Sequence, residues 1–394
     1  MSAPFPRIFP KHSLRAASWT CRRVKSSSHS LRQCRQNSSS AAAKPPAAAG
    51  DRIIFSGIQP TGVPHLGNYL GALQQWVRLQ NQAEPSTKLI FSIVDLHALT
   101  VPKDPNLLRQ WGKEMLAILV AVGLDPKRST IFLQSAVSAH SELMWILSTI
   151  SSMGYLSRMT QWKSKLQLPD NSTLEDPSAR SRLRLGLFSY PVLQAADILV
   201  HRATDVPVGE DQRQHLEFTR DMADSFNHIY GPVLSAPSAL ISSAKRVMSL
   251  KQPTLKMSKS HPDPRSRILL TDSAEEIQQK IKTALTDSEP GISYDPARRP
   301  GVSNLIEILS HVQKDGMSFT ELAAEYQDTS LRAFKEHVAA AVAEHLRGIR
   351  ERYFELMDAT PGYLNSVAEE GALAANENAN ITLNAVKNAT GLSS

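Results

Sequence analysis

Two short segments of the sequence hold residues suited to binding a nucleotide polyphosphate. The first is His65-Leu66-Gly67-Asn68, which follows the apolar run Ile53-Ile54-Phe55 and the loop that begins at Gly57. A strand, a loop and a helix start in this order favour a phosphate site, because backbone N–H groups and the positive helix end face the ligand. The second is Lys256-Met257-Ser258-Lys259-Ser260, where two lysines three residues apart can neutralise phosphate charge.

Either segment alone is a weak signal, because short motifs of this kind are mostly solvated turns. Two further stretches accompany them, Ile93-Val94-Asp95-Leu96-His97-Ala98-Leu99-Thr100 and Val208-Gly209-Glu210-Asp211-Gln212. In this order the four segments resemble those of class I aminoacyl-tRNA synthetases, with Asn68 in place of the final histidine of the first motif. The run from Phe55 to about Thr390 is similar to tryptophanyl-tRNA synthetases of the bacterial and mitochondrial type.

The resemblance implies activation of tryptophan by ATP. A carboxylate attacks the α-phosphorus, so catalysis consists of positioning and charge neutralisation. Mg²⁺ is expected to bind mainly through the phosphates, without a metal site made of protein ligands. The resemblance implies catalytic roles for Lys256, Lys259, Asn68 and Lys165. The ATP-binding residues that it implies are Gln59, Pro60, Thr61, Gly67, Asn68, Gly209, Glu210, Asp211, Val247, Lys256, Met257, Ser258, Lys259 and Ser260.

Some of these residues also have an ordinary structural interpretation. His65 fits a surface histidine as well as a ligand, and Gly209-Glu210-Asp211 fits an acidic helix start that needs no ATP. A glycine at position 67 is specifically explained by ATP binding, because any Cβ there would hold the adenine base away from the backbone.

Recognition of tryptophan is expected to depend on Asp197, in the segment Tyr190–Asp197. The indole N–H only donates, so a carboxylate in the pocket is its natural partner. The alternative is a structural ion pair between Asp197 and a neighbour such as Arg202. The resemblance adds Phe55, His97 and Tyr190 as pocket walls, each of which could also be an ordinary core residue. Gln194 stands where many bacterial relatives carry methionine, which leaves the packing of the indole edge open.

The elements that must position these residues alternate between strands and helices. We expect strands at Ile53–Phe55, Lys88–Thr100 and Thr130–Gln134, and helices at Leu107–Gly123, Ala139–Met153, Leu187–Val200 and Asp211–Tyr230. This alternation predicts a doubly wound parallel-sheet, Rossmann-like α/β catalytic domain over residues 51–270, with ligands at the carboxyl ends of the strands. Within it, the polar residues 167–184 are expected to form a mobile loop.

The pattern becomes helical towards the C-terminus, and we place the domain change near Thr271. Apolar residues at three-to-four spacing predict one long helix: Leu331, Phe334, Val338, Val342, His345, Ile349, Tyr353 and Leu356. The resemblance implies that residues 271–394 form an all-α domain that binds the tRNA anticodon across a homodimer. Arg347, Arg350 and Arg352 share that helix with acids and read better as a solvated face.

Residues 1–50 differ from the rest in charge. They contain nine Lys or Arg and no Asp or Glu, and both cysteines, Cys21 and Cys34, lie here. Acid-free, Arg- and Ser-rich N-termini are typical of mitochondrial transit peptides, which predicts a matrix enzyme. A basic arm that binds nucleic acid is the alternative. The remaining 35 Lys and Arg are balanced by 37 Asp and Glu, so tRNA must be held by local basic patches.

Three other functions compete with this interpretation. A tyrosyl-tRNA synthetase would share the fold, and Asp197 could accept from a phenolic hydroxyl. A catalytically silent RNA-binding or splicing protein has no need of Lys256 and Lys259. A small-molecule nucleotidyltransferase would lack the long helical tail. No apolar run is long enough for a membrane span. The expected partners are therefore L-tryptophan, ATP and tRNA(Trp).

Overall fold

The computed structural model describes residues 52–209, 212–241, 246–313, 316–358 and 361–393. The predicted transit segment, residues 1–50, lies outside these ranges, as do Glu210 and Asp211. Within these ranges, no helix has the length and apolar character that a membrane crossing requires.

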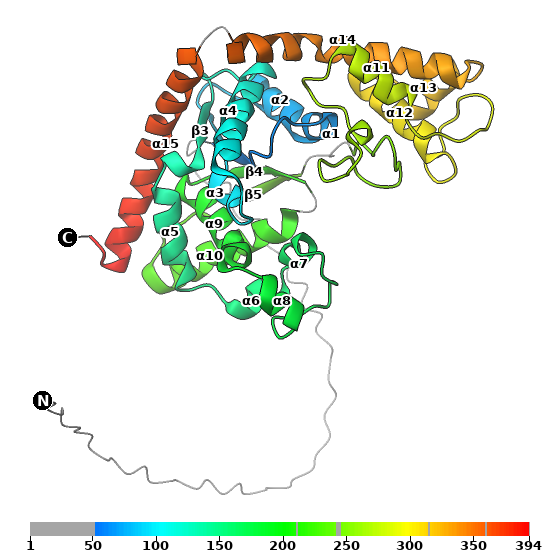
Figure 1. The fold of residues 1–394 in the computed structure, drawn as a ribbon. Helices are drawn as coiled ribbons and strands as arrows, with labels where there is room; N and C mark the ends of the chain where they lie inside the picture. The colour runs from blue at the N-terminus through cyan, green and yellow to red at the C-terminus, as the bar shows by residue number, and fades with distance from the viewer. Residues whose placement is uncertain (1–51, 210–211, 242–245, 314–315, 359–360, 394) are drawn as a thin grey trace, which may run out of the picture. The chain divides into compact units, whose positions relative to one another are not determined.

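A five-stranded parallel sheet positions the site (Figure 1). Its strands are β1 (Ile53–Ile58), β2 (Lys88–Ile93), β3 (Thr130–Leu133), β4 (Asp205–Val208) and β5 (Ser238–Ile241), in the order β3-β2-β1-β4-β5. β1 pairs with β2 from Ile53 opposite Lys88 to Ile58 opposite Ile93. The sheet grows in opposite directions from β1 and β4, and ligands of such sheets bind outside the strand ends at this switch point. The predicted doubly wound fold is therefore confirmed.

Side chains of the central strands alternate between two buried clusters, because successive residues of a strand face opposite sides. Ile54 and Phe91 join the cluster beneath α2 (Gln74–Gln82) and α4 (Pro105–Ala121). Phe55 and Ile90 join the cluster on the other face. The helices of that face are α5 (Ala139–Ser148), α9 (Leu185–Val200) and α10 (Arg213–Tyr230). Coverage on both faces explains why these strands read as apolar runs.

The predicted strand Lys88–Thr100 is too long, because β2 ends at Ile93 and α3 (Asp95–Ala98) follows. The Asp95 carboxylate accepts hydrogen bonds from the backbone N–H groups of Leu96, at 3.1 Å, and Ser135, at 2.9 Å. These bonds turn the chain into a short helix at the strand end, and this helix carries His97.

Two other predicted elements also differ. The helix expected over Ala139–Met153 ends at Ser148, and α6 (Met153–Arg158) begins after Ser152, whose hydroxyl accepts from the N–H of Tyr155 as an N-cap. Residues 167–184 are not all loop, because they contain α8 (Pro177–Arg182), which begins with proline at its first position.

The described residues after Thr271 contain five helices. They are α11 (Ala274–Lys282), α12 (Pro300–Val312), α13 (Phe319–Glu325), α14 (Leu331–Asp358) and α15 (Pro361–Thr390). The long helix predicted from its apolar stripe is confirmed as α14. The buried residues of its stripe include Phe334, Val338, Val342, Leu346, Ile349, Tyr353 and Leu356. His345, which was predicted for this stripe, is only half-buried, and its neighbour Leu346 takes the buried position.

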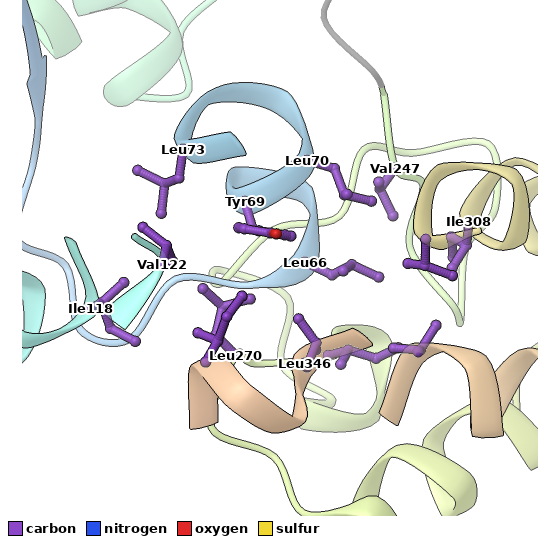
Figure 2. Close-up of a cluster of buried hydrophobic side chains, with 14 of the residues drawn as sticks. Leu66, Tyr69, Leu70, Leu73, Ile118, Val122, Val247, Leu270, Ile308 and Leu346 are labelled. Atoms are coloured by element: carbon purple, nitrogen blue, oxygen red, sulfur yellow. The ribbon is translucent and has the colours of Figure 1, made fainter. Parts of the chain in front are cut away.

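These helices pack directly behind the predicted phosphate segment. Figure 2 shows Leu66 of α1 (Leu66–Asn68) pointing towards Ile308 of α12 and lying near Leu346 of α14, while Leu70 of the following π-helix η1 (Tyr69–Leu73) lies beside Val247. Helix α15 then returns along β3 (Figure 1). The domain boundary near Thr271 stays a prediction.

Candidate active site

A cavity of about 460 Å³ opens at the carboxyl ends of β1 and β4, where the sheet changes direction. Predicted site residues line it from several elements: Phe55, Gln59, His97, Lys165, Tyr190, Gln194, Asp197 and Gly209. All five residues expected to bind tryptophan thus surround one space. Gln59, Lys165 and Gly209 from the ATP side border the same space.

Asp197 on α9 is a buried carboxylate with three protein donors. Its Oδ1 lies 2.6 Å from Gln134 Nε2 and 2.7 Å from His140 Nδ1, and its Oδ2 lies 2.8 Å from His97 Nε2. The side chain is only 3% exposed, and the residue lines the cavity. An ionised carboxylate offers about four lone-pair positions, so one position on Oδ2 is left for a ligand. The predicted structural alternative, an ion pair with Arg202, is not among the contacts of Asp197.

These donors keep Asp197 charged. Burial disfavours the ionised form, but hydrogen bonds from His140 and His97 outweigh burial and hold the pKa of Asp197 below its usual range. A carboxylate ionised in this way acts only as an acceptor, which suits a ligand that can only donate.

A second group of polar side chains, around Tyr190 and Gln194, also lines the cavity. The Tyr190 hydroxyl donates to Gln161 Oε1 of α7 (Gln161–Lys165) at 2.8 Å and lies 2.9 Å from His215 Nε2. The Gln194 amide donates to Gln212 Oε1 at 3.4 Å. The amide nitrogen of Gln194 therefore has a protein partner, at the position where many bacterial relatives carry methionine.

His65 and Asn68 hold the start of α1 through a reciprocal capping box. The N–H of Asn68 donates to His65 Nδ1 and the N–H of His65 donates to Asn68 Oδ1, both at 3.2 Å. His65 is 5% exposed, so it is a buried cap and the interpretation as a surface histidine is wrong. Burial, followed by the charges of Lys259 and Lys256, lowers the pKa of His65 to about 4, which keeps it neutral.

Gly67 sits where a side chain would be crowded. A Cβ at this position would lie 3.1 Å from the His65 ring and 3.6 Å from Val247 Cβ. Val247 is buried, and its carbonyl accepts from the N–H of Met257 at 3.0 Å. The predicted contributors Gly67, Val247 and Met257 are therefore neighbours in space.

The Lys256–Ser260 loop contacts the loop before α1 through Lys259. Its Nζ donates to the carbonyl oxygens of Gly62, at 2.7 Å, and Thr61, at 3.1 Å, and lies 3.3 Å from Thr61 Oγ1. Burial lowers the pKa of Lys259 to about 8. Lys256 and Ser260 are exposed, Met257 is buried, and the hydroxyls of Ser258 and Ser260 lie 2.8 Å apart.

Backbone pairing joins these two motifs more firmly than one lysine could. The N–H of Leu66 donates to the carbonyl of Ile268 at 2.8 Å, and the N–H of Leu270 donates to that of Pro64 at 3.0 Å. The segment that follows the lysine loop thus forms a short ladder with the start of α1. The buried Pro60 and the exposed Thr61 lie in the loop between β1 and α1.

Several residues of the site were not predicted from the sequence. Gln134 and His140, which contact Asp197, lie in stretches that read as strand end and helix. Each is fully buried, at 0% exposure. A polar residue within an otherwise apolar stretch was the only signal available. Gln161 and His215, which contact Tyr190, were not predicted either. The predicted residues Glu210 and Asp211 lie outside the described residues.

The sequence is similar to those of known proteins. Residues 48–347 match the family model described as tRNA synthetases class I (W and Y). The mitochondrial tryptophan--tRNA ligase of Schizosaccharomyces pombe is 47% identical over 347 residues, which cover 86% of this chain and 95% of that protein. The chain belongs to the tryptophanyl-tRNA synthetase family.

Solved tryptophanyl-tRNA synthetases share the fold over nearly their whole length. The Mycoplasma pneumoniae enzyme is 32% identical with a TM-score of 0.76, and the match covers 87% of this chain and 99% of that one. The Campylobacter jejuni enzyme, complexed with ADP and tryptophan, is 30% identical with a TM-score of 0.71, covering 86% and 99%. The membership predicted from the four motifs is confirmed.

Proposed function

We propose that this chain attaches L-tryptophan to mitochondrial tRNA(Trp) at the expense of ATP. A carboxylate oxygen of tryptophan attacks the α-phosphorus of ATP, the bond to the bridging oxygen breaks, and pyrophosphate leaves as tryptophanyl-adenylate forms. A hydroxyl of the terminal tRNA ribose then attacks the carbonyl carbon, and AMP leaves. Neither step needs a nucleophile from the protein.

The observation that carries this proposal is the surroundings of Asp197. Three protein donors occupy all but one acceptor position of a buried carboxylate that faces a cavity of about 460 Å³. Indole N–H would fill that last position. An amino acid with no donor there would leave the buried charge short of a partner, which costs free energy.

The phosphates are proposed to lie between α1 and the Lys256–Ser260 loop. Lys256, Lys259 and Lys165 would neutralise charge on the departing pyrophosphate, and Asn68 would donate to a phosphate oxygen. Burial, with a smaller contribution from Lys103, lowers the pKa of Lys165. No cluster of three His, Cys, Asp or Glu residues suited to a metal exists in the described ranges. Mg²⁺, which keeps several waters and binds mainly through substrate phosphates, would reach the site on ATP.

ATP–pyrophosphate exchange by the full chain, with each of the twenty amino acids, tests this function. Exchange with tryptophan alone is expected. Exchange with tyrosine would show that Asp197 accepts from a phenolic hydroxyl, and no exchange with any amino acid would favour a silent RNA-binding protein or another nucleotidyltransferase.

The destination is proposed to be the mitochondrial matrix. Residues 1–50 carry nine basic and no acidic side chains, and the Schizosaccharomyces pombe relative is a mitochondrial enzyme. Cleavage is expected between about Arg35 and Gly50. N-terminal sequencing of the endogenous protein tests this, and an intact Met1 or Ser2 would contradict it.

The working form is proposed to be a homodimer. The strongly exposed apolar side chains include Trp145 at 72%, Met153 at 61% and Leu185 at 77%. Trp145 lies near the end of α5 and Leu185 at the start of α9, two helices that are joined where His140 contacts Asp197. Sedimentation equilibrium should give a dimer that Trp145→Glu shifts to monomer. A monomeric parent chain would contradict the proposal.

A further inference from the structure

A chain of buried hydrogen bonds leads from the proposed tryptophan site to the C-terminal helix. His140 contacts Asp197 Oδ1 through Nδ1 at 2.7 Å, and its Nε2 lies 3.2 Å from His201 Nε2. His201 Nδ1 lies 3.0 Å from Asn378 Oδ1 on α15. Both histidines are 0% exposed, and Asn378 borders a groove of about 480 Å³ between α15 and the amino ends of β2 and β3. This chain of hydrogen bonds thus runs from the carboxyl end of the sheet to its amino end.

The acceptors at the two ends of this chain of hydrogen bonds decide which ring nitrogens carry protons. The Asp197 carboxylate can only accept, so His140 Nδ1 carries a proton. The Asn378 oxygen accepts, so His201 Nδ1 carries one as well. Burial and the charge of His140 lower the pKa of His201 to about 3, so His201 holds a single proton and its Nε2 is an acceptor. The two Nε2 atoms, 3.2 Å apart, join the His140 and His201 rings.

We infer that His140, His201 and Asn378 are positioning residues that set the orientation of the Asp197 carboxylate from helix α15, so that its remaining acceptor position on Oδ2 faces the amino acid. The C-terminal helix therefore takes part in selecting tryptophan without touching it. This inference rests on the proposed role of Asp197 as the partner of the indole N–H.

The packing around His201 allows the hydrogen bonds to be removed without removing the ring. The Phe55 and His201 rings stack with centroids 5.5 Å apart, and Phe132 meets His201 edge to face at 5.7 Å. His201→Phe keeps an aromatic ring in this stack and deletes both hydrogen bonds. Asn378→Leu deletes only the outer acceptor, and Asn378→Asp keeps an acceptor at the same position.

Exchange kinetics of the full chain test the inference. His201→Phe should raise the KM for tryptophan roughly tenfold, the size expected for one lost hydrogen bond to a charged network, with the KM for ATP and kcat within about twofold. It should also reduce the preference for tryptophan over an analogue with sulfur in place of the ring N–H. Asn378→Leu should raise the same KM by about threefold, and Asn378→Asp should restore it.

A structural role for α15 would give a different result. Leu383→Ala weakens the docking of α15, since Leu383 is 5% exposed in the core, but leaves the chain of hydrogen bonds intact. It should lower the melting temperature and leave the KM for tryptophan unchanged. An equal rise of that KM in Leu383→Ala would overturn the inference.

The remaining outcomes separate this inference from the proposed function. If His201→Phe does not fold, the KM values for tryptophan of Asn378→Leu and Asn378→Asp test the positioning role instead. A KM for tryptophan within twofold of the parent in the folded variants would overturn the positioning role alone, provided that Asp197→Ala loses its preference over the sulfur analogue. If Asp197→Ala keeps that preference, the proposed role of Asp197 fails, and the inference with it.

Discussion

Lys259 and Gly62 are joined by a hydrogen bond of 2.7 Å from the lysine Nζ to the glycine carbonyl oxygen. This bond holds the lysine loop against the loop before α1, at the place proposed above for the phosphates of ATP. A carbonyl is a weaker partner for an ammonium group than a phosphate, so the same side chain can turn to phosphate oxygens with little movement of the backbone.

Lys259→Ala is therefore expected to slow activation of tryptophan by roughly 10² or more. The side chain acts on charge that develops as pyrophosphate leaves, so the loss should fall on kcat rather than on binding of tryptophan. Lys256→Ala should behave in the same way. Pre-steady-state activation kinetics measure this, with Lys113→Ala, an exposed lysine of α4, as the control. A change confined to the Kd of tryptophan would contradict the prediction.

Asp197→Ala should reduce kcat/KM for tryptophan by about 2–4 kcal/mol, the range for losing a buried bond to a charged group. The parent should strongly reject an analogue with sulfur or oxygen in place of the ring N–H, because the analogue leaves the carboxylate short of a partner. The variant should discriminate far less, while its KM for ATP barely changes. An equal loss for tryptophan and the analogue would mean that Asp197 is structural.

Acid should destabilise the folded chain through His65. Its pKa is about 4 in the fold, against 6.5 without burial and the nearby lysines, so the unfolded chain binds more protons between these values. The contribution is fully present above pH 6.5 and is lost as pH falls towards 4, which amounts to about 2 kcal/mol between pH 7 and pH 5.

His65→Asn provides the matched comparison, since asparagine also caps helices but does not titrate in this range. Urea unfolding at both pH values should show a smaller decrease in the free energy of unfolding for the variant. The same decrease in both proteins would exclude His65 as the source.

Gly371→Ala should detach α15 from the sheet. A Cβ at this position would overlap the carbonyl oxygen of Ile131 on β3. The overlap could be relieved only by moving the backbone of α15 or of β3, which costs free energy. We expect a loss of about 3 kcal/mol or more in the free energy of unfolding, at the upper end for overpacking. Gly362→Ala in the same helix meets no atom within 4 Å and should be neutral or slightly stabilising. Thermal melting of both variants checks this, and similar melting temperatures would contradict it.

The sequence by itself determined the features whose causes are local. The helix start after the loop at Gly57 and the long helix α14 were predicted from the local order and spacing of residues. The apolar runs of β1 and β2 indicated strands covered on both faces. Local patterns also gave a wrong prediction. The apolar run after Lys88 was predicted to be one strand, because nothing within it shows that Asp95 accepts a hydrogen bond from the N–H of Ser135, 40 residues away, and begins α3.

Only the tertiary structure decided which distant residues complete the site. Lys259 reaches Gly62 across 197 residues, and His201 reaches Asn378 across 177. Gln134 and His140 meet Asp197 because β3, α5 and α9 converge at one face of the sheet. The sequence showed Asp197 as a carboxylate, but its charge and its single remaining acceptor position depend on those neighbours. The physical reason is that hydrogen bonding and burial depend on distance in space, which residue type and spacing do not encode.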